Sequence, residues 1–494
     1  MSMTLPSKQN KTSLMELIHR SRLEPQQIAV RKGEELPTYK LLRTPETLDE
    51  LNSDTAIWME NGTLVVVGGF FMPSMATTQF PKCLELRSFV TIEIFGDADD
   101  AIVETAVYFG SLRTSRKDEV KDLSIKYSEE IDFDAARSER LAALFQPASQ
   151  MKITFLSKVD KFLSAVLATR PYPIDLEFET SPFDAGAFFE HLESRTTSFG
   201  SLSLGYLELS KQLQQRLFHH LHLFEHLQIN GLPRELILKL LAAPMKSIGF
   251  TLNHKTARMN VAKSDIVATI IRIESFNDVN PNPFLQSFLK RVTETRHLES
   301  LSLTLHEGYY DTVTIEQTLI RAVRVNQNLK HLEFMACEHQ WGRCIQQLFV
   351  VAETHESLRS MKIKSYPDGY DPQYKWLKRL LTRNRYLKVT DILYGEIEAD
   401  EETFRIYNLN QFFRDSKKLK EAPATIRPSL VGMALTDEYM NDHQRTGLLL
   451  SDHVDVLCKL VHPVVNFGEE IVGEVDMEDE NLSSAAALRK RKTT

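Results

Sequence analysis

Apolar residues recur in a fixed local spacing along the middle of this chain, at the first, fourth and sixth positions of short polar stretches. The clearest copies of this LxxLxL-like pattern are "FEHLQI", "LESLSL", "LKHLEF" and "LRSMKI". Weaker copies begin at residues 87, 120, 148, 171, 199, 245, 268 and 387. Because successive side chains of a strand point to opposite faces, the fourth and sixth positions share one face. The pattern predicts a series of short strands, each with one buried face.

Most of these strands are followed by a segment with helical periodicity. Apolar residues there recur three or four positions apart, as in Ile315, Leu319, Ala322 and Val323. Such segments cover residues 97–113, 159–170, 233–243, 282–298, 314–327 and 371–384. A single strand and helix cannot bury its own apolar face, so the units stack on one another. The expected fold is an α/β right-handed solenoid, with parallel strands on the concave face and helices outside.

The repeated pattern resembles the leucine-rich repeats of the ribonuclease-inhibitor type, which carry LxxLxLxxN/CxL. Cys337 matches the Asn or Cys position, eight residues after Leu329. Other copies hold different residue types at that position: Leu232, His306, Tyr366 and Gly395. This departure implies an irregular arc rather than a regular horseshoe. More loosely, the chain is similar to uncharacterised leucine-rich-repeat-like families of diatoms, a resemblance that implies no activity.

The pattern divides the chain into four parts. Residues 1–86 are expected to form an α+β cap, because Asn61-Gly62 between two apolar runs predicts a hairpin with a type I′ turn. Residues 87–395 hold the degenerate repeats. Residues 396–467 read as a helical C-terminal cap, and residues 468–494 as a disordered charged tail. The tail ends in four consecutive basic residues, Arg489 to Lys492, which form a weak nuclear-import signal.

Composition narrows the classes of partner. The 494 residues include 59 basic and 67 acidic ones, a net charge of -8, so nothing global favours nucleic acid or an anionic membrane. No apolar run matches a signal peptide or a membrane span. The four cysteines are too sparse for a disulfide framework and fit a reducing compartment. We therefore expect a cytoplasmic protein, with the nucleus as the alternative, that binds another protein and neither nucleic acid nor membrane.

One stretch raises the question of enzymatic activity. His222, Glu225 and His226 spell HxxEH, the zinc signature of inverzincin peptidases, which requires both histidines on one face of a helix. The repeat register instead places this stretch on a strand, where the two histidines would lie about 13 Å apart. Cys337, His339 and Cys344 match no standard zinc spacing. We expect no catalysis, metal or cofactor; a zinc hydrolase using HxxEH remains the alternative.

The positions between the strand anchors predict a binding surface on the concave face. Its centre is small and polar, one end is acidic through Asp175 and Glu177, and the other end is basic. The candidate binding residues are His226, Gln228, Asn230, Arg272, Glu274, Ser300, Ser302, Thr304, His331, Glu333, Lys362 and Lys364. Loops that follow two of the strands add a second set: Tyr309, Tyr310, Tyr366, Tyr370 and Tyr374.

An equally good interpretation is that these tyrosines only cover the repeat edges. The sequence as a whole favours a non-catalytic protein-interaction scaffold. A regulator of a small GTPase is a further alternative, supported by fold analogy alone.

Overall fold

The computed structural model describes most of the chain between residues 13 and 458. The residues outside the described part are 1–12, 32, 52, 69–79, 89, 113–120, 146–150, 179–182, 206, 208, 276–278, 306–311, 337, 365, 368, 393–394, 396, 398, 437–442, 457 and 459–494. The chain divides into two units. Unit 1 comprises Met1–Tyr370 and Val389–Ile397, and unit 2 comprises Asp371–Lys388 and Glu398–Thr494. The predicted tail and its basic run lie outside the described residues.

Unit 1 begins with a mixed, mostly antiparallel sheet. Its strands are β1 (Met15–Leu17), β4 (Thr38–Leu41), β5 (Thr55–Trp58), β6 (Leu64–Gly68), β7 (Lys82–Arg87) and β8 (Thr91–Gly96). They pair in the order β1-β4-β5-β6-β8-β7, and only β4 and β5 run parallel. The strand predicted around Ile92 is β8, which is antiparallel to both of its neighbours. The first predicted copy of the repeat is therefore not a parallel strand.

Small elements complete this region. A two-stranded sheet pairs β2 (Val30–Arg31) with β3 (Glu34–Glu35). Single turns of 3-10 helix are η1 (Arg20–Arg22), η2 (Pro25–Gln27) and η3 (Leu48–Glu50).

The predicted hairpin joins β5 and β6, but its turn is not the predicted type I′. That type needs a positive φ at both central residues, and only Gly62 has one, at +84°. Gly62 donates its backbone N–H to the Met59 carbonyl (3.1 Å), and Met59 donates to the Thr63 carbonyl (2.9 Å). These bonds define a three-residue loop with glycine at the left-handed position, a common hairpin connection. The Asn61 amide donates to the Thr105 hydroxyl (2.9 Å) and its oxygen accepts from Thr63.

A long, mostly parallel sheet follows, and it does not close into a barrel. Its strands are β9 (Lys121–Tyr127), β10 (Met151–Phe155), β11 (Ile174–Phe178), β12 (Gly200–Ser203), β13 (Phe224–Ile229), β14 (Ser247–Leu252), β15 (Ile270–Ser275), β16 (Ser300–Leu305), β17 (His331–Met335), β18 (Ser360–Ile363) and β19 (Lys388–Asp391). From β9 to β18 each strand runs parallel to the next. On its other side β9 is antiparallel to β7, which joins this sheet to the N-terminal one.

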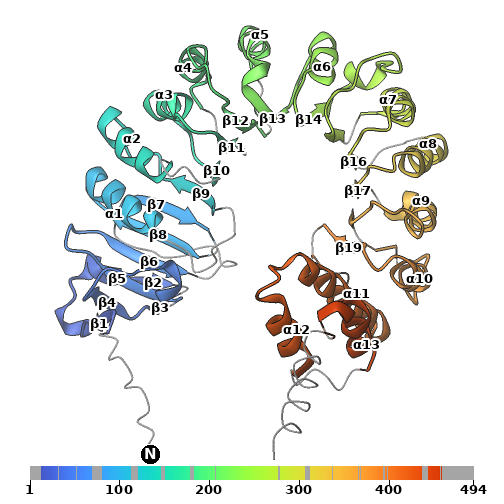
Figure 1. The fold of residues 1–494 in the computed structure, drawn as a ribbon. Coiled ribbons are helices and arrows are strands. Elements are labelled where there is room, and N and C mark those ends of the chain that lie inside the picture. The colour runs from blue at the N-terminus through green and yellow to red at the C-terminus, as the bar shows by residue number, and fades with distance from the viewer. Residues whose placement is uncertain are drawn as a thin grey trace, which may run out of the picture. The chain divides into compact units, whose positions relative to one another are not determined.

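Helices alternate with these strands and lie on one side of the sheet (Figure 1). They are α1 (Asp99–Ser111), α2 (Ala135–Ala142), η4 (Ala143–Phe145), α3 (Lys161–Thr169), α4 (Ala185–Leu192), α5 (Lys211–His219), η5 (Leu221–Leu223), α6 (Arg234–Leu241), η6 (Thr256–Arg258), α7 (Asn282–Thr295), α8 (Thr312–Val325) and α9 (Glu338–Ala352). Five of the six segments with helical periodicity are confirmed as helices here, and the sixth, residues 371–384, contains α10 (Lys375–Arg383) of unit 2. Between β14 and β15 the connection holds only the short turn η6.

Four successive helices, α2 to α5, begin at a side-chain cap. The carboxylates of Asp134, Asp160 and Asp184 and the hydroxyl of Ser210 each accept a hydrogen bond from the backbone N–H three residues later. Such caps satisfy one of the backbone donors that a helix leaves free at its start and are worth about 1 kcal/mol each. They fix where each strand-to-helix turn ends.

The strand pairing aligns the predicted anchors in one row, but the copies beginning at residues 148 and 171 pair two residues away from the predicted register, since Leu123 pairs with Ile153 and Leu176 with Leu202. One row of aligned residues runs through the parallel strands: Ile153, Leu176, Leu202, Leu227, Ile248, Ile271, Leu301, Leu332 and Met361. Every member is at most 1% exposed. A slip of one residue would turn this whole row to the opposite face, so burial fixes the register strongly.

Gly200 marks an irregularity in that register. The pairing of β12 with β13 shifts between Gly200 and Ser201. Gly200 has φ +98°, and a Cβ there would lie 2.5 Å from the Ile174 carbonyl oxygen of β11. Any other residue would therefore be strained and would clash with backbone.

Unit 2 consists of helices. They are α10 (Lys375–Arg383), α11 (Glu401–Lys418), η7 (Leu419–Glu421), α12 (Arg427–Thr436) and α13 (His443–Asp452). Helix α11 packs on both α10 and α13. Asp400 caps α11 by accepting from the Thr403 N–H (2.9 Å), and Lys378 of α10 donates to Asp400 (2.7 Å). That hydrogen bond lowers the pKa of Asp400 to about 2. The prediction of helices after residue 395 is confirmed for the described part.

Candidate binding face

The parallel sheet presents two rows of aligned side chains on the side away from the helices. We call this surface the open face. The first row is Lys152, Asp175, Ser201, His226, Ser247, Ile270, Ser300, His331 and Ser360, and the second row is Thr154, Glu177, Ser203, Gln228, Gly249, Arg272, Ser302, Glu333 and Lys362. These residues alternate with the buried anchors, as the period of a strand requires.

The open face contains a hollow of about 340 Å³ that extends from β10 to β17. Gly249 of β14 lies in it and contributes no side chain. A Cβ at Gly249 would meet the Cγ of Gln228 at 3.1 Å, so glycine leaves room for Gln228 to extend over the strand. Gln228 accepts a hydrogen bond from Arg272 of β15, on the far side of β14. The hollow therefore has a floor of backbone and small side chains, most of them serines.

One side of the hollow is acidic. The Nζ of Lys152 lies 2.8 Å from a carboxylate oxygen of Glu177, which neutralises that pair. Burial, the largest single influence, would lower the pKa of Lys152, but the hydrogen bond to Glu177 and the charges of Glu177, Asp122 and Asp175 together outweigh it and the pKa is raised. Asp175 forms no hydrogen bond or ion pair with any described residue. Partial burial in the hollow raises the pKa of Asp175, and the charges of Lys152 and His226 oppose that rise.

His226 lies two strands from Asp175 in the first row, with Ser201 between them. It is half-buried, and burial followed by the positive charge of Lys246 lowers its pKa. The nearby carboxylates of Glu225 and Asp175 act in the opposite direction. At neutral pH the His226 imidazole is therefore uncharged and offers one hydrogen-bond donor and one acceptor.

The other side of the hollow carries an exposed cation. The Nη1 of Arg272 donates to the Oε1 of Gln228 at 3.4 Å, a long hydrogen bond, and contacts no carboxylate within the described part of the chain. Glu333, two strands away, accepts instead from the hydroxyl of Ser302 (3.1 Å). Arg272 thus keeps most of its five N–H donors available to a ligand.

The structure brings only some of the candidate residues into the hollow. Those that line it are His226, Gln228, Arg272, Ser300, Ser302 and Glu333. Of the rest, Asn230 and Thr304 are buried, Glu274 and Lys364 are half-buried, and His331 and Lys362 are exposed beyond the hollow. Asn230 donates to the Gly205 carbonyl and accepts from the Thr251 hydroxyl, so it stabilises the fold.

Gly249 and Ile270 line the hollow from alternate positions of their strands, although the sequence-derived concave surface did not include them. The strand period does place them on the open face, but neither has a polar group that would mark it as a binding candidate. Their contribution is space and a small apolar contact.

The tyrosine candidates separate in the structure. Tyr309 and Tyr310 lie outside the described residues. Tyr366 is 7% exposed, with its ring centroid 6.3 Å from that of Phe349, and Tyr370 is exposed beside Gly342 of α9. Tyr374, in unit 2, has a positive φ and precedes α10. Tyr366 therefore packs between elements of unit 1, whereas Tyr370 remains accessible.

The HxxEH stretch is not one helix. His222 lies in the 3-10 turn η5, and Glu225 and His226 lie in β13. The expectation that the whole stretch is a strand is thus wrong for His222. Among the described residues, no group of three or more His, Cys, Asp or Glu side chains is placed to hold a metal ion. Cys344 is buried, which raises the pKa of its thiol, and Cys337 lies outside the described residues.

Unit 2 brings a serine, a histidine and an aspartate together, but not in the order of a catalytic triad. The buried His453 contacts the Ser416 carbonyl through Nε2 (2.9 Å), while its Nδ1 lies 3.2 Å from Arg427. In a triad a carboxylate accepts from that second nitrogen. Asp452 instead forms an ion pair with Lys417 (2.5 Å). The cluster links α11 to the end of α13.

The chain matches no protein-family model and no curated protein. Among the described helices, none has both the length and the apolar character needed to cross a membrane.

Proposed function

We propose that the chain is a leucine-rich-repeat-like scaffold that binds a partner protein through the open face. The observation that carries this proposal is the hollow along the uncovered side of a parallel sheet. Parallel sheets usually have both faces covered by helices and are apolar on both. Here one face is apolar and the other is lined with serine, histidine and charged side chains. Such a surface is typical of solenoid proteins that bind along their strands.

The open face suits a protein ligand better than a small molecule. The hollow reaches across eight strands and is wide and polar, whereas small-molecule pockets are mostly apolar and enclose their ligand. Carboxylates at Asp175, Glu177 and Glu333 disfavour the phosphate backbone of a nucleic acid. Mixed charges and hydroxyl groups match the polar contacts of a protein interface.

Site-specific photo-crosslinking in cells tests this proposal. A photoreactive residue is placed at Ser247 or Ser300, both in the hollow, and, as matched controls, at Gln212 of α5 or Lys239 of α6, both exposed on the helices. We expect discrete adducts with another protein from the two hollow positions and none from the controls. Adducts from the helix positions alone, equal adducts from both sets, or none at all would contradict binding at the open face.

The alternatives have no supporting observation of comparable weight. The zinc hydrolase requires His222 and His226 on one helix, and the two lie in different elements. Regulation of a small GTPase rests on analogy with other repeat proteins, and no contact among the described residues favours it.

A further inference from the structure

We propose that the open face binds an extended segment of its partner that crosses the strands and carries one basic and one acidic residue about six positions apart. This inference rests on the proposed function and specifies the ligand of the same face. The basic residue lies over Asp175 and the acidic residue over Arg272.

The charges at the two positions are opposite, and neither forms an ion pair with a described residue. Asp175 on β11 has no hydrogen bond or ion pair among the described residues, although its neighbours Lys152 and Glu177 are paired with each other at 2.8 Å. Among the described residues, Arg272 on β15 forms a side-chain hydrogen bond only with Gln228, at 3.4 Å. Elsewhere in the hollow, Glu333 accepts from Ser302. Asp175 and Arg272 are thus the two groups that gain most from an external partner of opposite charge.

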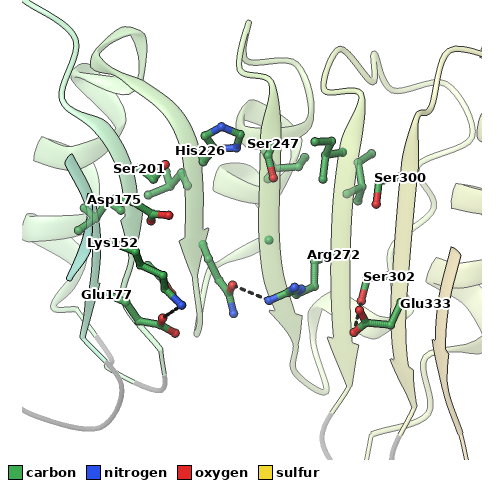
Figure 2. Close-up of a pocket in the computed structure, with 18 residues that line it drawn as sticks. Lys152, Asp175, Glu177, Ser201, His226, Ser247, Arg272, Ser300, Ser302 and Glu333 are labelled. Atoms are coloured by element: carbon green, nitrogen blue, oxygen red, sulfur yellow. Dashed lines mark hydrogen bonds and ion pairs between the residues drawn. The ribbon is translucent and has the colours of Figure 1, made fainter. Parts of the chain in front are cut away.

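The strand order sets the distance between the two charges. From β11 to β15 there are four steps, through β12, β13 and β14. At about 4.8 Å a step, the two strands lie about 19 Å apart. An extended chain advances about 3.3 Å per residue, so about six residues span that distance. Figure 2 shows Asp175 and Arg272 apart along the hollow, with His226 and Ser247 on the strands between them.

The surface between the charges suits a crossing backbone. Ser201, Ser247 and Gly249 are small, so a peptide can approach closely, and the hydroxyls and the neutral imidazole of His226 can exchange hydrogen bonds with its amides. A ligand strand cannot instead join the sheet here, because each of β11 to β15 already pairs with a strand on both sides. Side chains, rather than strand backbone, must hold the ligand.

A display library of random 12-residue peptides, selected on the full chain, tests this inference. We expect enrichment of peptides with Lys or Arg and Asp or Glu five to seven positions apart. The charge-exchanged variant, Asp175→Lys with Arg272→Glu, should bind the enriched peptides about five- to twentyfold more weakly. It should recover binding to the same peptides synthesised with their two charges exchanged.

The matched control exchanges Glu235→Lys and Lys239→Glu on the exposed surface of α6, with the same net charge change. It should leave both affinities unchanged. A neutral variant, Asp175→Asn with Arg272→Gln, should bind both peptide sets weakly while melting at the wild-type temperature.

Three results would overturn the inference: no enriched spacing, binding that survives the charge exchange, or equal loss in the α6 control. Crosslinks from Ser247 and Ser300 report the proposed function independently. If they form while the charge exchange has no effect, the face binds a protein of different chemistry. If they also fail, both proposals fall.

Discussion

The two sides of the parallel sheet differ in burial and in polarity. On the helix side, anchors such as Leu301 and Leu332 are completely buried and aligned from strand to strand. On the open face, their immediate neighbours Ser300 and His331 are accessible and polar. Residues adjacent in sequence therefore have different roles. The buried row stabilises the fold, and the accessible row can contact a ligand. A substitution can affect one side while leaving the other intact, and the predictions below test that separation.

The largest effect is expected on the helix side. Leu301→Ala or Leu332→Ala removes a fully buried side chain and leaves a cavity, so each should lower the free energy of unfolding by about 2–5 kcal/mol. Urea unfolding followed by circular dichroism measures the change. A loss below about 0.5 kcal/mol at both positions would show that the anchors do not form the core.

Asn230 is an exception to the separation between buried, stabilising residues and accessible open-face residues. It lies on the open side of the sheet but is only 3% exposed. Asn230→Ala should cost about 1–3 kcal/mol of unfolding free energy, since it leaves the buried Thr251 hydroxyl and the Gly205 carbonyl without their partner. Adding Thr251→Val should recover part of the loss, because the orphaned hydroxyl is then removed as well. An Asn230→Ala variant as stable as wild type would assign this residue to the accessible surface.

Ser300 should behave as a true open-face residue. Ser300→Ala is expected to change the free energy of unfolding by less than about 0.5 kcal/mol, because its hydroxyl makes no hydrogen bond with any described residue. Ser302 is a poorer control, since it is buried and donates to Glu333. A loss at Ser300 comparable to that at Leu301 would contradict the alternation of the two faces.

The smallest effect concerns pH. The folded state lowers the pKa of His226, mainly by burial, so the unfolded chain takes up this proton first as the pH falls below about 6.5. The stabilising contribution of uncharged His226 to the free energy of unfolding is therefore present above that pH and is lost as the pH falls. Between pH 7.5 and 5.5, urea unfolding of His226→Gln should lose less stability than the wild type. A greater loss in the variant would show that folding raises the pKa.

The buried half of the fold was predictable because burial leaves a periodic trace. The anchors from Ile153 to Met361 were identified from spacing alone. From Leu202 to Met361 the strand pairing aligns the fourth positions of the copies as expected, whereas Ile153 and Leu176, predicted at sixth positions, pair two residues away from the predicted register. Strand direction leaves no such trace. Ile92 has the same alternation in an antiparallel strand as it would have in a parallel one, so β8 was mistaken for a repeat.

The sequence predicted which residues lie on the open face, but not which of them are accessible or where the hollow forms. Strand period places His226, Arg272 and Ser300 on one side, and all three line the hollow. Whether such a position is accessible depends on segments distant in sequence, as with Asn230, which the carbonyl of Gly205 covers. The hollow itself depends on the missing side chain of Gly249 and on Gln228 extending across it, neither of which periodicity can reveal.

The double pairing of β9 has a consequence for self-association. An unpaired edge strand exposes a row of N–H and C=O groups, and it is where sheet proteins aggregate or exchange strands with copies of themselves. β9 has no such edge, because β10 pairs with it on one side and β7 on the other. The N-terminal antiparallel strands therefore protect this end of the parallel sheet. A second copy of the chain cannot pair with β9, because the backbone groups on both of its edges are already used.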